Sequence, residues 1–180
     1  MQNFIVLTGG PGSGKTSLLK FLDKVGFITV PEVARPIIKE QILINGDLLP
    51  WKNKAFFCRL MTERSLNAYK ETVRLNTKKT CFFDRGIIDC IAYAEMEDLL
   101  YPTLWNDYAR KYRYNSKVFL LPPWKQIYTN DQERKQTWEQ AVETYNWIKQ
   151  LYTKFDYDII ELPLVSIENR ISFIMDNLSH

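Results

Sequence analysis

The chain has 180 residues, of which 46% are hydrophobic and 25% charged, and its formal net charge is +3. This length fits one domain with a full hydrophobic core, and the small net charge gives no reason to expect nucleic-acid binding. No apolar run approaches the roughly 20 residues of a membrane-spanning helix, and the first residues lack the basic region of a signal peptide. Three cysteines without a CxxC pair and a single histidine, His180, argue against a disulfide framework and a His-rich metal site. We therefore expect a cytoplasmic protein.

Five short apolar runs alternate with helical patterns along the chain. The predicted strands are Phe4–Gly9, Phe27–Glu32, Thr80–Asp84, Ser116–Pro123 and Tyr157–Pro163. The predicted helices are Gly14–Lys24, Ala34–Ile44, Lys52–Asn76, Ile87–Leu99, Thr103–Lys111, a long helix that ends near Lys154, and Ile167–Leu178. Continuous apolar strands separated by helices are typical of a parallel sheet that is covered on both faces. Ligands bind at the carboxyl ends of such strands, so the residues that follow each strand are the functional candidates.

The segment GGPGSGKT, residues 9–16, matches the phosphate-loop pattern GxxxxGK[ST] and lies between a predicted strand and a predicted helix. Its glycines allow backbone N–H groups to surround phosphate oxygens, and the start of the helix adds a positive dipole. We expect Lys15 to reach the β- and γ-phosphates and the Thr16 hydroxyl to bind Mg²⁺. The residues predicted to bind the nucleotide are Gly10, Pro11, Gly12, Ser13, Gly14, Lys15, Thr16 and Ser17.

The third predicted strand ends at Asp84, where phosphate-loop proteins keep an acid that supports Mg²⁺. The next residue is Arg85, which cannot act as a base at neutral pH. Motor ATPases of the AAA type usually carry a second acid here, whereas an arginine suits the binding of an anionic or hydroxyl-rich second substrate. A signalling GTPase is also disfavoured, because the guanine-reading NKxD is missing and the DxxG pattern fails at Ile87. Guanine binding itself stays open.

Four segments, residues 4–22, 30–35, 82–93 and 119–141, together resemble the AAA-domain family of small phosphate-loop proteins. That family is similar to the ribosylnicotinamide kinase domain of a bacterial NAD regulator and to an animal GTP-binding protein of trafficking. The resemblance covers the chain from Phe4 to about Ile174. It implies an α/β fold of the P-loop NTPase type, like that of nucleoside and nucleotide kinases. The implied sheet has five parallel strands in the order 2-3-1-4-5 with helices on both faces, within one domain over residues 1–180 and a lid at about 123–135.

The resemblance also implies roles for residues outside the phosphate loop. Glu32 takes the place of a carboxylate near the acceptor hydroxyl, and Arg85 takes that of the arginine in the kinases' Asp-Arg motif. Arg134 lies in the implied lid, where arginines contact the transferring phosphate, and Lys135 replaces the second arginine that family members often have. The predicted catalytic residues are Lys15, Asp84, Arg85, Arg134 and Glu32, and the predicted metal ligands are Thr16 and Asp84. Which of the two carboxylates is the base stays open.

Several of these candidates have a purely structural interpretation as well. Glu32 and Arg35 are three residues apart and could pair with each other. Asp89 could cap or pair within its own helix, and Tyr93 could either pack in the core or line a substrate pocket. The basic segment Lys52–Lys79 could be a solvated face, or it could attract an anionic substrate or an acidic lipid surface.

The sequence thus predicts a Mg²⁺-dependent kinase that uses ATP, with GTP as an open alternative. It would transfer the γ-phosphoryl group to a hydroxyl of a small nucleoside-like metabolite, which is the expected partner; no nucleic-acid partner is expected. The alternative is a nucleotide-binding regulatory module with slow hydrolysis, which controls a partner or membrane association. The identity of the acceptor and the oligomeric state stay open.

Overall fold

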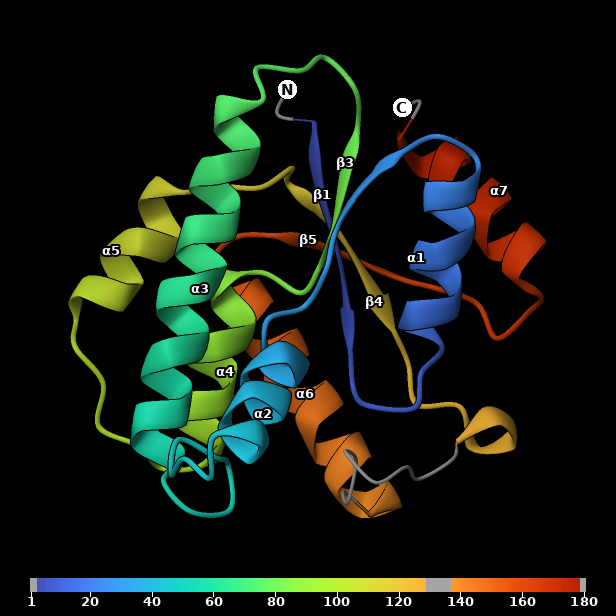
Figure 1. Cartoon of the computed structure of the whole chain (residues 1–180). Helices are drawn as coiled ribbons and strands as arrows, with labels where there is room; N and C mark the ends of the chain where they lie inside the picture. The colour runs from blue at the N-terminus through green and yellow to red at the C-terminus, as the bar shows by residue number, and fades with distance from the viewer. Residues whose placement is uncertain (1–2, 129–136, 179–180) are drawn as a thin grey trace.

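The computed structural model describes residues 3–128 and 137–178. Its centre is a sheet of five parallel strands in the order β2-β3-β1-β4-β5 (Figure 1). The strands are β1 (Phe4–Gly9), β2 (Ile28–Val30), β3 (Cys81–Asp84), β4 (Lys117–Leu121) and β5 (Asp158–Glu161). The predicted order and direction of the strands are confirmed.

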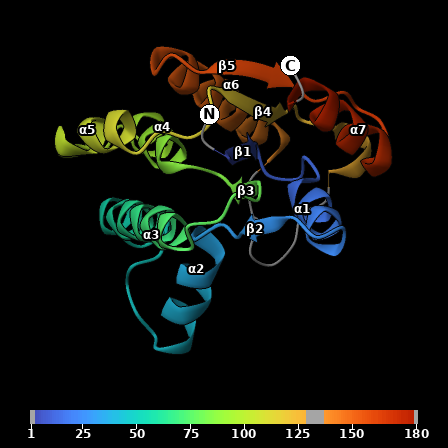
Figure 2. The same cartoon turned by 90° about the horizontal axis from the view of Figure 1, so that it is seen from above.

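The helices cover both faces of this sheet. They are α1 (Lys15–Lys24), α2 (Ala34–Leu43), α3 (Lys54–Arg74), α4 (Ile87–Met96), α5 (Leu104–Lys111), α6 (Trp138–Lys154) and α7 (Ile167–Leu178), with a 3₁₀ turn η1 (Lys125–Ile127) after β4. Seen from above, α1 and α7 lie on one side of the sheet and α3, α4 and α6 on the other (Figure 2). α2 packs against α3, and α5 packs against α4.

Two apolar cores form because successive side chains of a strand point to opposite faces of the sheet. Ile5 and Leu7 of β1 point into the smaller core beneath α1 and α7. Phe4 and Val6 of the same strand point into the larger core, which α2 to α6 cover. All six residues of β1 are buried, as expected for the middle strand of a sheet that is covered on both sides.

Four strands, β2 to β5, are shorter than the sequence predicts, and proline explains two of these differences. β2 ends at Val30 instead of Glu32, because Pro31 has no N–H to donate to a neighbouring strand. β4 ends at Leu121 because two prolines follow it. Of the implied lid, residues 123–128 are described and include η1, whereas Arg134 and Lys135 lie outside the described residues. Across 3–128 and 137–178, no helix combines the length and hydropathy needed to span a bilayer.

Candidate nucleotide and acceptor site

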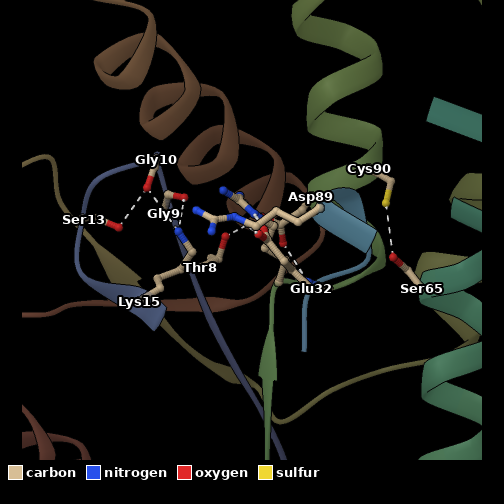
Figure 3. A network of polar contacts seen from close by, with 12 residues as sticks. Thr8, Gly9, Gly10, Ser13, Lys15, Glu32, Ser65, Asp89 and Cys90 are labelled. Carbon is tan, nitrogen blue, oxygen red and sulfur yellow. Dashed lines mark hydrogen bonds and ion pairs between the residues drawn. The ribbon is translucent and has the colours of Figure 1, made fainter. Parts of the chain in front are cut away.

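The phosphate loop leaves the carboxyl end of β1 and leads directly into α1. Gly12 (φ +73°) and Gly14 (φ +88°) adopt left-handed backbone conformations. Residues with a side chain rarely adopt such conformations, which explains why glycine occurs at both positions. The Lys15 Nζ lies inside the curve of the loop and donates to the carbonyls of Gly9 and Gly10, each at 3.1 Å (Figure 3). The Ser13 hydroxyl donates to the Gly10 carbonyl at 2.8 Å. The loop therefore curls around the ammonium group that is expected to meet the phosphates.

A buried arginine of α7 supports this loop from outside. Arg170 is 2% exposed, and its Nη1 donates to the Ser13 carbonyl at 3.1 Å. Its Nε donates to the Pro163 carbonyl at 2.9 Å, and its guanidinium carbon lies 4.7 Å from the centre of the Trp124 ring. Sequence analysis missed Arg170, because an arginine within an amphipathic helix gives no local signal of a partner that lies 157 residues away.

Asp84, at the end of β3, is 9% exposed. Its Oδ1 is buried, and no hydrogen-bond partner for it occurs among the described residues. Burial raises the pKa of this carboxyl group, and the nearby charge of Lys15 opposes that shift. Buried carboxylates are normally paired or bind a metal ion, so an oxygen atom without a partner at this position suits a divalent cation.

Arg85, Glu32, Arg35 and Asp89 form one chain of ion pairs. Arg85 Nη1 lies 3.0 Å from Asp89 Oδ1, and Arg85 Nε lies 3.5 Å from Glu32 Oε2. Glu32 Oε1 in turn lies 3.0 Å from Arg35 Nε, so the predicted pairing of these two residues occurs. Burial by itself lowers the pKa of Arg85, but the charges of Asp89, Glu32 and Asp84 outweigh burial and raise it. Arg85 is thus a permanent cation that two carboxylates share.

Asp89 binds more groups than its sequence position suggests. It caps its own helix by accepting from the Gly86 N–H at 2.8 Å, as one of its interpretations predicts. It also accepts from the Thr8 hydroxyl (Figure 3). In addition it accepts from the Tyr152 hydroxyl at 2.7 Å and pairs with Arg85. These contacts join β1, α4 and α6. Sequence analysis missed them, because Thr8 and Tyr152 lie 81 and 63 residues from Asp89.

A cavity of about 480 Å³ extends from the phosphate loop to the space enclosed by α2, α3, α4 and α6. Its inner end brings together six of the predicted residues: Pro11, Lys15, Thr16, Glu32, Asp84 and Arg85. Its outer part has mainly apolar walls, which include Ile38, Phe57, Met61, Tyr93, Met96 and Ile148. A cavity of this size and composition suits a small molecule with a flat apolar part and a polar end.

Two further side chains in this cavity are neutral at physiological pH. Tyr93 lines the cavity, and burial raises the pKa of its hydroxyl. Cys90 also lines it, and burial raises the pKa of its thiol to about 11. Neither group is therefore suited to act as a base or nucleophile near pH 7. Tyr93 belongs to the pocket and also packs edge-on against Phe57, with ring centres 6.0 Å apart, so both of its interpretations apply.

Among the remaining predicted residues, Gly10, Gly12, Ser13 and Gly14 belong to the phosphate loop itself. Ser17 is exposed on the first turn of α1, and Arg134 lies outside the described residues. In the basic segment, Arg59 pairs with Glu63 at 3.0 Å, and Arg64 makes a two-pronged contact with Glu40. These two arginines are thus already paired with carboxylates.

Known proteins share both the sequence pattern and the fold of this chain. The model of a family described as AAA domain matches residues 4–170. No individually curated protein matches the chain. Similar solved structures include deoxyadenosine kinase from M. mycoides with bound dCTP, at a TM-score of 0.64 and 16% identity, with 98% of each chain covered.

Two other structures show the same likeness. Thymidylate kinase from Ehrlichia chaffeensis has a TM-score of 0.64 and 14% identity, with 97% of each chain covered. The NadR protein in complex with NR has a TM-score of 0.69 and 17% identity, and the match covers 98% of this chain and 50% of that one. At these identities the likeness establishes the fold, which is the P-loop NTPase fold of nucleoside and nucleotide kinases, as predicted.

Proposed function

The chain belongs to the AAA-domain family, and from that premise we propose that it is a Mg²⁺-dependent kinase. It transfers the γ-phosphoryl group of ATP to a hydroxyl of a small nucleoside-like metabolite. The observation that carries this proposal is one cavity whose inner end joins the phosphate loop, through Lys15 and Thr16, to Glu32 and Arg85. A donor nucleotide on the loop and an acceptor in the cavity would therefore meet at Asp84.

The donor side of the reaction depends on the phosphate loop. Backbone N–H groups of the loop and the N-terminus of α1 bind the phosphates, and Lys15 places its charge beside them. Thr16 and Asp84 would hold Mg²⁺, and the unpartnered Oδ1 of Asp84 among the described residues fits that role. Within those residues no cluster of three His, Cys, Asp or Glu side chains could hold a metal, but Mg²⁺ in kinases keeps waters and phosphate oxygens as its other ligands. The bound ion would neutralise charge on the phosphates.

The acceptor side depends on Arg85 and Glu32. The guanidinium donors of Arg85 hold the hydroxyl-bearing part of the acceptor, and Glu32 orients Arg85 and Arg35. The hydroxyl proton passes to Glu32 or to Asp84. Since the transition state of phosphoryl transfer is loose, positioning and charge carry most of the catalysis, and the choice of base matters less.

The test is a transfer assay with ATP labelled in its γ-phosphate, Mg²⁺ and a pool of nucleosides and other small alcohols. We expect labelled phosphate to appear on at least one compound faster than it appears as free phosphate. The alternative function, a regulatory module, predicts only slow hydrolysis together with nucleotide-dependent binding to a partner or to liposomes. That result would contradict the kinase.

The variant Lys15→Ala tests the phosphate loop. For the wild type, ATP at about 100 times its Kd should stabilise the protein by about 2.7 kcal/mol. That corresponds to a rise in Tm of roughly 5–10 °C. Lys15→Ala should abolish this shift, because the loop loses the ammonium group that meets the phosphates. Lys20→Ala, at an exposed position of the same helix, is the control and should keep the shift. If ATP raised the Tm of Lys15→Ala as much as that of the wild type, the loop would not be part of the nucleotide site.

A further inference from the structure

Among the described residues, the charged side chains that line the acceptor cavity balance one another. The cations among its described lining residues are Lys15, Arg35, Lys54 and Arg85, and the carboxylates are Glu32, Asp84, Asp89 and Glu97. Four positive and four negative groups give a formal charge of 4 − 4 = 0. A pocket that binds a phosphate group normally offers cationic donors in excess. The balance of positive and negative groups therefore limits which kind of acceptor the cavity can bind.

Each cation on the acceptor side already has a carboxylate beside it. Arg85 lies between Asp89 at 3.0 Å and Glu32 at 3.5 Å. Arg35 lies 3.0 Å from the other oxygen of Glu32, and Lys54 pairs with Glu97. An acceptor phosphate would have to displace these carboxylates, or lie next to them as a like charge.

Asp89 cannot turn away from Arg85 when a ligand arrives. It is 7% exposed, and it accepts hydrogen bonds from the Gly86 N–H, from Tyr152 and from Thr8, the last of which Figure 3 shows. These donors come from β1, from the start of α4 and from α6, so the position of the carboxylate is set by three parts of the core. The Asp89 carboxylate is thus held in place beside Arg85.

We propose that Asp89, together with Glu32, makes this cavity select hydroxyl compounds without a phosphate group over their monophosphates. Arg85 can then donate to neutral hydroxyl oxygens, which need no excess charge, whereas a phosphate dianion meets the fixed carboxylate of Asp89 and the carboxylate of Glu32. Asp89 acts through Arg85 and is a specificity-determining residue, not a catalytic one. The inference rests on the proposed kinase function and separates a nucleoside kinase from a nucleotide kinase.

The test compares the affinities of nucleosides and of their 5′-monophosphates by calorimetry. The protein is saturated with Mg²⁺ and an ATP analogue whose γ-phosphate cannot be transferred, so that only acceptor binding is measured. The variants are Asp89→Asn and Glu32→Gln, which each remove one negative charge beside Arg85. The matched control is Tyr152→Phe, which removes one hydrogen bond to Asp89 but no charge. Far-UV circular dichroism shows which variants fold. If Asp89→Asn does not fold, the result for Glu32→Gln tests the inference.

The wild type should bind nucleosides at least about tenfold more tightly than monophosphates, and each charge variant should lower that ratio by about tenfold. Tyr152→Phe should keep the ratio within about twofold. Equal or tighter binding of monophosphates by the wild type would overturn the inference and leave the kinase standing. An unchanged ratio in the folded charge variants would overturn it too. If the wild type neither binds nor phosphorylates either class, the proposed function fails and the inference fails with it.

Discussion

At the scale of single residues, the two buried acids Asp84 and Asp89 differ sharply in how they are paired. Asp89 accepts hydrogen bonds from three groups and pairs with Arg85. Asp84 keeps one buried oxygen atom that has no partner in the described part of the chain. A buried carboxylate oxygen without a partner destabilises the folded state, so the role in Mg²⁺ binding that we propose for Asp84 would come at a cost in stability.

The variant Asp84→Asn should separate the effect of this carboxylate on stability from its proposed role in binding Mg²⁺. Because burial raises the pKa of Asp84, the folded wild type loses stability as the pH rises from about 4, the ordinary pKa, through the raised value. Asparagine cannot ionise, so the nucleotide-free variant should be more stable than the wild type at pH 7 by about 1 kcal/mol or more. That gain should shrink towards pH 4.

The same variant should lose the extra stabilisation that Mg²⁺ adds to bound ATP, because a ligand of the ion is gone. Thermal unfolding with and without Mg²⁺ and ATP measures both effects. Asp23→Asn, at an exposed position of α1, serves as the control and should change neither. A lower Tm of the nucleotide-free Asp84→Asn protein would contradict this account of the site.

At the scale of elements, the phosphate loop is packed between the segment after β4 and the start of α6. A Cβ on Gly12 would lie 2.5 Å from the Tyr128 ring, and a Cβ on Gly10 would lie 2.5 Å from the Ala141 carbonyl oxygen. Tyr128 in turn packs edge-on against Trp138, with ring centres 5.5 Å apart. The loop thus carries glycine both for its backbone angles and because neighbouring elements lie so close.

A pair of glycine variants separates these two reasons. Gly12 (φ +73°) and Gly26 (φ +96°) both have left-handed backbones, but a Cβ on Gly26 would meet nothing within 4 Å. Gly26→Ala should therefore lower stability by about 1–2 kcal/mol, from the backbone alone. Gly12→Ala should add about 1–3 kcal/mol from the contact with Tyr128.

Denaturant titration measures the two losses, and calorimetry with ATP measures binding. Only Gly12→Ala should weaken ATP binding, because its Cβ displaces the loop that surrounds the phosphates. Equal effects of the two variants on stability would show that the contact with Tyr128 is unimportant.

At the scale of the whole molecule, Arg170 joins the end of the chain to its beginning. It extends from α7 to the Ser13 carbonyl of the loop after β1, and its buried Nε and Nη1 both donate to backbone carbonyls, whereas Nη2 has no hydrogen-bond partner among the described residues. Burial lowers the pKa of this guanidinium. The nucleotide site is thus built from elements at both ends of the chain.

The variant Arg170→Ala should lower stability by about 2–4 kcal/mol, because the buried Ser13 carbonyl and the partly buried Pro163 carbonyl lose their donor and the contact with Trp124 disappears. It should also weaken ATP binding, since the Ser13 carbonyl is no longer held. Arg59→Ala removes an exposed arginine that pairs with Glu63 on the same helix, and it should change stability by less than about 0.5 kcal/mol. Denaturant unfolding and calorimetry with ATP check both. Loss of stability with full ATP affinity would show that Arg170 only supports the fold.

Local sequence patterns by themselves determined the strands, most helices and the phosphate loop. Apolar runs, glycines at fixed spacing and prolines act within a few residues, so they can be recognised without knowing the fold. The pair Asp84 and Arg85 was identified because it follows a predicted strand, and the strand order came from the resemblance to a known family. β2 and β4 were predicted too long, because the effect of proline on strand pairing was underestimated.

Only the tertiary structure decided which charges meet. The four groups bound by Asp89, the support of the loop by Arg170 and the charge balance of the cavity join residues that lie far apart in the chain. Such contacts depend on how whole elements pack, and no local pattern records them. Sequence thus predicted the phosphate loop, whereas packing decided which charges line the cavity beside it.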